Sequence, residues 1–362
     1  MKLNIRKILL QQILVLICCF SFTANAQLRD ITENTEVSLM TCGVGDDLYS
    51  LFGHTALRFK DQSQNIDVVF NYGLFDFSTP NFYGKFVKGD LFYNLGVDSY
   101  NDFIRYYSYK DRDVTEQKIN LTFEQKNKLW LDIWDTYNSD ERFYHYKFIE
   151  NNCTTKVADL INKYSTTKLE TNFESNNKTY REILNEYLAM QYLPQLGINV
   201  IFGKKVDQTN QLLFLPDQLL KGADLTPNLI KETNVLYKST VNRFDKISYA
   251  KYVFFVLIGI LVILSGKKVV RKSYFVVISI LGLIMLFLQF YSLHMELLNN
   301  PMMGVYNPLY LLLFLLPNKR KIIHLGLLTI GVISLFFMSV EMLLIVFPLL
   351  LLHFVMLYRD IK

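Results

Sequence analysis

The stretch NNCTTKVADL, residues 151–160, joins a polar loop to an amphipathic segment. Apolar side chains follow at spacings of three and four residues, namely Val157, Leu160, Ile161 and Tyr164. This spacing predicts a helix that starts at or just before Cys153, with Asn151 or Asn152 as its cap. The unpaired N–H groups and the positive dipole end at such a start stabilise a thiolate. Cys153 is therefore a candidate nucleophile, the alternative being a small buried residue at a helix start.

Three upstream segments carry strand patterns. They are 35–42, 55–69 and 67–72, the last of which Gly73 is expected to end. A Gly-rich turn at 43–47 separates the first two. Residues 121–137 instead show helical spacing, with Thr122 as cap and Gln125 at the capping-box position. This part of the chain therefore mixes strands and helices.

His54 lies at the start of the second predicted strand, on the same face as Ala56 and Arg58. A histidine brought close to Cys153 would complete a nucleophile–base pair. The alternative is a histidine at a strand edge with no chemical role. Asn71, on the third predicted strand, is a candidate to orient His54, or else a turn residue before Gly73.

Charge divides the chain into regions of opposite character. Residues 27–245 hold 24 Lys and Arg against 30 Asp and Glu, whereas residues 246–362 hold 11 against three. The basic excess therefore lies in hydrophobic segments and their flanks, which argues against a nucleic-acid partner. An aromatic content of 15% argues against disorder. A membrane-anchored protein with a soluble domain remains.

The first 26 residues are typical of a secretory signal peptide. Lys2, Arg6 and Lys7 precede the apolar run 8–22, and Ala24-Asn25-Ala26 supplies a small-residue cleavage site. We expect cleavage after Ala26, the alternative being an uncleaved anchor. The predicted domains are then the signal peptide 1–26, a periplasmic domain 27–245 and a transmembrane domain 246–362.

The tail carries about five apolar segments, at 248–265, 273–292, 305–317, 322–340 and 342–358. Basic clusters at 267–272, at 319–321 and at the C-terminus fall on one side if there are five crossings. By the positive-inside rule that side is the cytoplasm, so residues 27–245 lie outside. We therefore expect a multi-pass protein of the bacterial inner membrane with a cytoplasmic C-terminus.

Beyond the signal peptide the chain keeps two cysteines, Cys42 and Cys153. A single disulfide between them remains open in an oxidising compartment, but two cysteines make no disulfide framework. No CxxC or His-x-His spacing indicates a zinc site, so we expect neither a metal nor a cofactor.

FGHTALRF followed about 100 residues later by NNCTTKVADL resembles the circularly permuted papain-like proteins, which include NlpC/P60 and lecithin:retinol acyltransferase-like enzymes. More specifically, the chain resembles the Lnb-type lipoprotein N-acyltransferases of Bacteroidota over nearly its whole mature length. Further matching segments are FNYGLFDF (70–77), NFYGKFVKGDLFY (81–93), TYREIL (179–184), FLPDQL (214–219) and a tail loop within 293–311. Val44 and Lys156 depart from the family pattern, where Pro and Arg are usual.

The resemblance implies an α+β fold, a permuted papain-like periplasmic domain followed by about five membrane helices. It also implies transfer of an acyl chain from a phospholipid to the α-amino group of a diacylglyceryl-cysteine lipoprotein. Cys153 would attack the ester and form a thioester, with His54 as base and Asn71 orienting it. Asn152 and Thr154, beside the nucleophile, are expected to support the oxyanion.

Polar residues of the loop after the second apolar segment are further candidates, for contact with headgroups or with the lipoprotein; they are His294, Glu296, Asn299 and Asn300. A solvated loop is the alternative.

Two other functions stay open. A papain-like cysteine peptidase or amidase acting on periplasmic peptides or peptidoglycan would use the same Cys–His pair. A non-enzymatic envelope scaffold would need neither residue. The transmembrane domain favours the transferase, because both of its substrates are lipids that stay in the bilayer. The sequence leaves the acyl chain, headgroup, ester position and oligomeric state undetermined.

Overall fold

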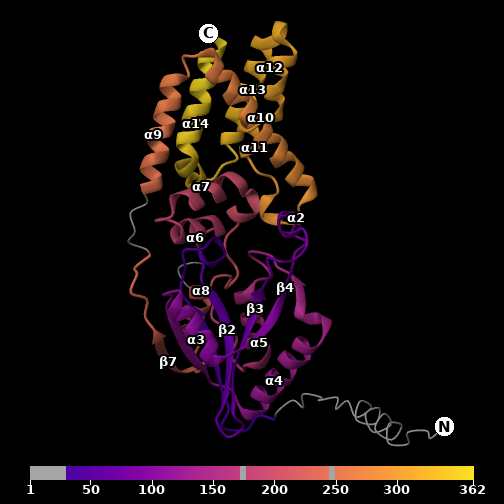
Figure 1. Cartoon of the computed structure of the whole chain (residues 1–362), viewed down its shortest axis with the longest axis vertical. Coiled ribbons are helices and arrows are strands. Elements are labelled where there is room, and N and C mark those ends of the chain that lie inside the picture. The colour runs from indigo at the N-terminus through magenta and orange to yellow at the C-terminus, as the bar shows by residue number, and fades with distance from the viewer. Residues whose placement is uncertain (1–29, 172–176, 244–248) are drawn as a thin grey trace, which may run out of the picture.

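A computed structural model of the chain describes residues 30–171, 177–243 and 249–362. The predicted signal peptide and its cleavage site lie outside these ranges. The described chain has two parts, a sheet with surrounding helices and a bundle of apolar helices stacked on one end of it (Figure 1).

Within the described residues, seven strands form one antiparallel sheet with the order β6-β4-β3-β2-β1-β5-β7. The strands are β1 Glu36–Cys42, β2 His54–Asp61, β3 Ile66–Leu74, β4 Phe92–Ser99, β5 Val114–Ile119, β6 Phe143–His145 and β7 Ile230–Tyr237. This is the mixed α and β architecture that was expected, but the strand predicted at 55–69 is divided in two. Strand β2 ends at Asp61, whose carboxylate accepts from the N–H groups of Ser63 and Gln64 and so forms a turn, and β3 begins at Ile66. Strand β1 lies between β2 and β5, next to the central strand β2, and its residues from Val37 to Cys42 are buried on both faces.

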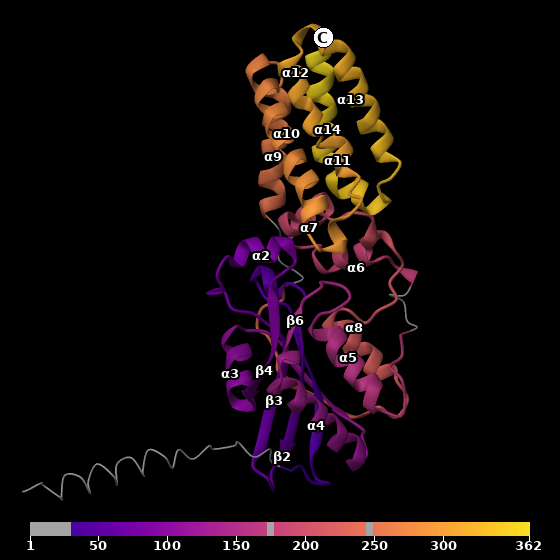
Figure 2. The same ribbon diagram turned by 90° about the vertical axis from the view of Figure 1, so that its right-hand side faces the viewer.

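Helices cover the two faces of the sheet. These helices are α3 Tyr100–Tyr109, α4 Phe123–Asn138, α5 Cys153–Tyr164 and α8 Pro216–Leu225. Helix α3 packs on one face over a small core that contains Met40, Cys42 and Ala56. Helices α4, α5 and α8 cover the other face over a larger core that contains Leu39 and Phe70 (Figure 2).

Local capping sets where two of these helices begin. The Thr122 hydroxyl accepts a hydrogen bond from the Gln125 N–H at 3.3 Å, and the Gln125 side-chain oxygen accepts one from the Thr122 N–H at 2.8 Å. Asn152 caps α5 in the same way. Both predicted helix starts are thereby confirmed, because capping depends on residues three positions apart and is visible in sequence.

The end of the third strand was predicted wrongly. Strand β3 does not stop before Gly73 but runs to Leu74, with a shift of register against β4 between Asn71 and Leu74. Gly73 has φ +88°, a conformation that glycine adopts without strain. The glycine therefore marks an irregularity inside the strand. The aromatic stretch at 81–93 forms helix α2 Phe82–Lys88 and the start of β4.

Helices α6 Tyr180–Tyr187 and α7 Tyr192–Ile201 lie between the sheet and the apolar helices (Figure 2). Tyr192 and Leu196 of α7 belong to the hydrophobic core of the apolar bundle. After α7 the backbone comes very close to the loop that follows helix α10 in the chain. A Cβ on Gly203 would lie 1.8 Å from the Leu298 carbonyl oxygen, and the Gly203 N–H donates to the Glu296 carbonyl at 2.7 Å.

The apolar bundle differs from the expected five spans. Its helices are α9 Tyr249–Leu264, α10 Lys268–Tyr291, α11 Met302–Val305, α12 Leu312–Leu315, α13 Arg320–Leu335 and α14 Val340–Ile361. Among the described residues only α10, with 24 residues, and α14, with 22, are long and apolar enough to cross a membrane. A 16-residue helix such as α9 reaches only about 24 Å, less than a hydrocarbon core of about 30 Å. The third predicted span is broken at Pro308, which begins a short 3-10 turn between α11 and α12.

The basic clusters gather at the end of the bundle that lies away from the sheet (Figure 1). Asp360 there pairs with Arg271, at 3.1 Å, and with Arg320. Arg359 donates to the Ser265 hydroxyl at 2.7 Å. The three clusters therefore lie on one side, as the charge pattern predicts.

Candidate active site

Cys153 is the first residue of α5 and is 8% exposed. The Asn152 side-chain oxygen accepts from the N–H groups of Thr154 and Thr155 at 2.8 and 2.9 Å. The cap fixes the start of the helix at the thiol, so the positive end of the helix dipole points at the sulfur.

The thiol lies beside His54, the first residue of β2. Burial raises the pKa of Cys153, but the charge of His54 and a hydrogen bond from its ring both lower that pKa. The N–H of Thr55 and the hydroxyl of Thr154 add smaller contributions in the same direction. The net effect is a Cys153 pKa below that of an ordinary cysteine, which favours the nucleophilic thiolate.

A hydrogen-bonded chain orients His54 from behind. Its Nε2 lies 3.1 Å from the Asn71 side-chain oxygen, and the Asn71 amide donates to an Asp98 carboxylate oxygen at 2.9 Å. Because a carboxylate only accepts, it turns the Asn71 amide nitrogen toward Asp98 and the oxygen toward His54. His54 must then donate from Nε2, which leaves Nδ1 as the proton acceptor.

Asp98 had no signal in the sequence. It lies on β4 opposite Val69, two residues from the position opposite Asn71. Its approach to Asn71 depends on the pairing of β3 with β4, which no local pattern determines. Burial raises the Asp98 pKa, as does the neighbouring Asp102, while His54 lowers it.

Tyr107 and Cys42 lie on the other side of the His54 ring. The rings of His54 and Tyr107 are stacked at 6.3 Å with an interplanar angle of 11°. Cys42 is opposite His54 in the β1–β2 register and is a free thiol, as is Cys153, so the two form no disulfide here. Burial raises the pKa of Cys42 to about 12. Cys42 is thus a core residue beside the site and a poor nucleophile.

The residues expected to support the oxyanion are placed differently. Both amide hydrogens of Asn152 are already donated, to the carbonyls of Phe148 at 2.7 Å and of Phe214 at 2.9 Å. Asn152 therefore positions the helix start. The Thr154 hydroxyl lies 3.8 Å from the Cys153 sulfur and 3.1 Å from the Thr55 hydroxyl.

Tyr144, on β6, is a site residue that sequence reasoning missed. It is 9% exposed, and its hydroxyl has no hydrogen-bond partner among the described residues. A Cβ placed on Gly73 would be 3.9 Å from that hydroxyl and 3.6 Å from the Cys153 Cβ. A buried hydroxyl with an unused proton near the thiol is a potential donor to a reaction intermediate.

The loop after α10 does not extend into solvent. The His294 ring donates from Nε2 to the Phe86 carbonyl at 2.8 Å, and Glu296, 4% exposed, accepts from the Ile149 N–H at 3.3 Å. The Asn299 N–H donates to the Gln289 side chain at 3.2 Å. In the structure these three predicted contact residues join the loop to the sheet domain or to α10.

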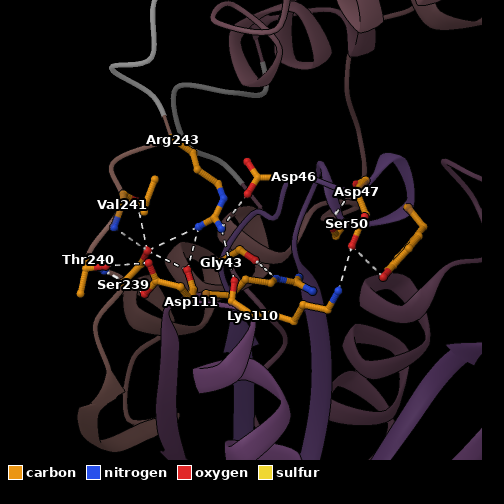
Figure 3. Close-up of polar contacts among 12 residues, drawn as sticks. Gly43, Asp46, Asp47, Ser50, Lys110, Asp111, Ser239, Thr240, Val241 and Arg243 are labelled. Carbon is orange, nitrogen blue, oxygen red and sulfur yellow. Dashed lines mark hydrogen bonds and ion pairs between the residues drawn. The ribbon is translucent and has the colours of Figure 1, made fainter.

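The loop between β1 and β2 is held by charged residues (Figure 3). Arg243 pairs with Asp46 at 3.1 Å and donates to the Asp111 carbonyl at 2.7 Å, while Lys110 pairs with Asp47 at 3.4 Å. The segment that follows β7 is thereby attached to the loop that leads into His54. Within the described residues no group of three or more His, Cys, Asp and Glu side chains could hold a metal ion.

Residues 23–186 match the family model of the Lnb N-terminal periplasmic domain. The match covers the whole Cys153–His54–Asn71 arrangement. No curated protein and no solved structure matches the chain.

Proposed function

Because the chain is an Lnb-type protein with an N-terminal periplasmic domain, we propose that it is a lipoprotein N-acyltransferase. It takes an acyl chain from a membrane phospholipid and passes it, through a thioester on Cys153, to the α-amino group of a diacylglyceryl-cysteine lipoprotein. The observation that carries this proposal is the thiol at a helix start beside His54, which lowers the pKa of that thiol and is itself oriented by Asn71 at 3.1 Å. The same residue types in the same roles serve papain-like proteases, so a permuted papain-like fold is part of the proposal.

In the first half-reaction, His54 Nδ1 takes the thiol proton and the Cys153 sulfur attacks the ester carbonyl of a phospholipid. A C–S bond forms, and the C–O bond to the glycerol then breaks. The leaving alkoxide takes the proton back from His54 and departs as a lysophospholipid. The acyl chain remains on Cys153 as a thioester.

In the second half-reaction, the free amine of the lipoprotein attacks the thioester carbonyl. His54 takes a proton from the amine as the C–N bond forms, and the C–S bond breaks to regenerate the thiol. The product is an amide and a triacylated lipoprotein. Amines attack thioesters readily, and the buried position of Cys153 limits competing hydrolysis.

Both steps pass through a tetrahedral intermediate with a negative oxygen. We assign its stabilisation to the Cys153 N–H at the start of α5 and to the Tyr144 hydroxyl. The unpartnered, buried state of that hydroxyl supports the assignment, because it can donate without first breaking another bond. Asn152 acts indirectly, by fixing the helix start.

The proposal includes the placement of the chain in the bacterial inner membrane. Helices α10 and α14 lie across the bilayer, and residues 27–245 face the periplasm after removal of residues 1–26. The shorter helix α9 brings the chain to the far end of the bundle, which carries the C-terminus and faces the cytoplasm (Figure 1). Large exposed apolar side chains on the bundle support this, such as Ile263 on α9, Phe287 on α10 and Leu344 on α14. The basic clusters at the end away from the sheet support the orientation.

Mass spectrometry of the N-terminal lipopeptide of an abundant lipoprotein tests the proposal. Cells that lack this gene would carry either the wild-type chain or Cys153→Ala. We expect the third acyl chain to vanish without the gene and to return only with the wild type. If the lipopeptide stays triacylated throughout, with no redundant enzyme present, the transferase proposal fails and the peptidase or amidase alternative takes its place.

A further inference from the structure

Helix α2 carries an exposed aromatic surface. Phe77 just before it is 60% exposed, and Tyr83 and Phe86 on the helix are 76% and 45% exposed. Val87 extends the same surface. These four residues are here named the α2 aromatic face, and the three rings among them contact the buried ring of Phe82. Contiguous exposed apolar side chains of this kind are typical of a binding surface.

Hydrogen bonds place this face level with the end of a membrane helix. Helix α10 ends at Tyr291, and the next three residues each bond to a carbonyl of α2. Ser292 donates to Val87 at 2.8 Å, Leu293 to Lys88 at 2.7 Å and His294 to Phe86 at 2.8 Å. Figure 2 shows α2 at this junction of the two parts.

The surroundings match the border between a bilayer and water. Phe290 and Tyr291, on the last turn of α10, are exposed beside the α2 contacts. Lys85 and Lys88 lie in the last turn of α2. Aromatic rings together with basic side chains at the ends of membrane helices are the usual signature of the headgroup region.

A continuous row of rings leads from this face to the thiol. Phe86 neighbours Phe82 at 6.3 Å, Phe82 neighbours Phe75 at 5.8 Å, and Phe75 neighbours Tyr93 at 5.2 Å. Tyr93 stacks on Tyr146 at 4.5 Å.

The row ends at the nucleophile. Tyr146 lies beside Cys153, because a Cβ placed on Gly73 would be 3.3 Å from the Tyr146 ring and 3.6 Å from the Cys153 Cβ. Packed rings of the core therefore connect the α2 aromatic face to the residues beside the sulfur.

We propose that the α2 aromatic face enters the headgroup region of the membrane, and that this contact, joined to the site by the packed rings, brings the ester of a bilayer lipid to Cys153. The first part stands on the contacts with α10. The second part rests on the acyl-transfer function proposed above.

Fluorescence quenching tests the first part. The full chain with Tyr83→Trp is placed in nanodiscs of phosphatidylethanolamine and phosphatidylglycerol with brominated acyl chains. Phe123→Trp is the matched control, because Phe123 is 40% exposed but begins α4, the helix whose Lys126 donates to the Thr35 carbonyl at the opposite end of the sheet. The unsubstituted chain, with Trp130 and Trp134 in the sheet core, gives the background.

We expect the brominated lipid to quench the new tryptophan at position 83 but not that at 123. Equal fluorescence of Tyr83→Trp in brominated and ordinary nanodiscs would overturn the membrane contact. Equal fluorescence would overturn the proposal both if the face is exposed to water and if a second copy of the chain covers it.

Kinetics test the second part. The Tyr83→Ser/Phe86→Ser chain and the control Phe123→Ser are compared in acylation of Cys153 by nanodisc phospholipid and by the water-soluble ester p-nitrophenyl acetate. We expect the ratio of the two rates to fall about tenfold in the double variant and to stay constant in the control. An unchanged ratio would overturn the lipid path. If the wild-type chain takes no acyl group from phospholipid, the transferase function is refuted instead. The quenching experiment would then still show whether the α2 aromatic face contacts the membrane.

Discussion

Cys42 lies directly opposite His54 in the register of β1 with β2, yet the thiol whose pKa His54 lowers is that of Cys153. The two thiols therefore differ in their surroundings. Cys42 is enclosed in the core beneath α3, whereas Cys153 stands at a helix start beside an imidazole.

Selective alkylation follows from this difference. With iodoacetamide near neutral pH we expect modification of Cys153 and not of Cys42, because burial raises the Cys42 pKa to about 12 and leaves almost no thiolate. Peptide mass spectrometry reads out both sites. Labelling should persist in Cys42→Ala and disappear in Cys153→Ala. Comparable labelling of the two cysteines in the folded wild type would contradict the assignment.

The rate of alkylation should depend on pH through His54. In His54→Gln the charge and the ring hydrogen bond are lost while burial, which raises the Cys153 pKa, remains. The midpoint of the rate against pH should therefore move upward. Alkylation reactions quenched at set times over a series of pH values measure this midpoint. A midpoint that stays in place would show that the imidazole does not set the state of the thiol.

Asn71 and Asp98 should act through His54 as positioning residues. Asp98→Asn keeps an oxygen that accepts from the Asn71 amide, whereas Asp98→Leu removes it and frees the amide to turn over. We expect kcat to fall about tenfold or more in Asp98→Leu and Asn71→Leu, with KM little changed. Asp98→Asn should retain most of the rate. Equal losses in the two Asp98 variants would argue for a role of its charge instead.

Tyr144→Phe removes a single hydroxyl from the site. If that hydroxyl stabilises the oxyanion, acyl transfer should slow by about 10²-fold, the usual range for one donor. Alkylation of Cys153 by iodoacetamide passes through no oxyanion and supplies the control. It should proceed at close to the wild-type rate. A parallel loss in both reactions would mean that the ring only supports the position of the thiol.

The contact between the two parts of the molecule can be tested with two glycines. Gly203→Ala places a Cβ 1.8 Å from the Leu298 carbonyl oxygen, so the backbone must shift. Gly197→Ala, on α7, meets no atom within 4 Å and improves helix propensity by about 1 kcal/mol. Thermal unfolding in detergent should show a lower Tm for Gly203→Ala and an equal or higher Tm for Gly197→Ala. If Gly197→Ala instead had the lower Tm, the close contact at Gly203 would not be what joins the two parts of the molecule.

Sequence patterns predicted the parts of the site that depend on nearby residues. The helix start at Cys153 and its asparagine cap follow from spacing over a few positions, and His54 and Asn71 come from alternating strands. Asp98, Tyr107 and Tyr144 reach the site only through strand pairing or packing on the sheet, for which a single sequence has no local signal.

The chemical role of a residue and the length of a helix are subject to the same limit. Asn152 has a side chain suited to an oxyanion, but its amide is used by the carbonyls of Phe148 and Phe214. Four of the five predicted apolar segments correspond to helices α9, α10, α13 and α14, whereas the third is broken into short pieces, and the length of each helix depends on where its turns fall. The apolar segments therefore predicted more membrane spans than the helices provide, because α9 and α13 are too short to count as spans.

The close approach of Gly203 to Leu298 also bears on how an acceptor would be chosen. A rigid junction keeps the sulfur at one height above the membrane, so the number of bonds between a lipoprotein's anchored glycerol and its amine decides whether that amine can arrive. Selection would then depend on distance and not on the amino acids that follow. A single enzyme could in this way modify many lipoproteins of unrelated sequence.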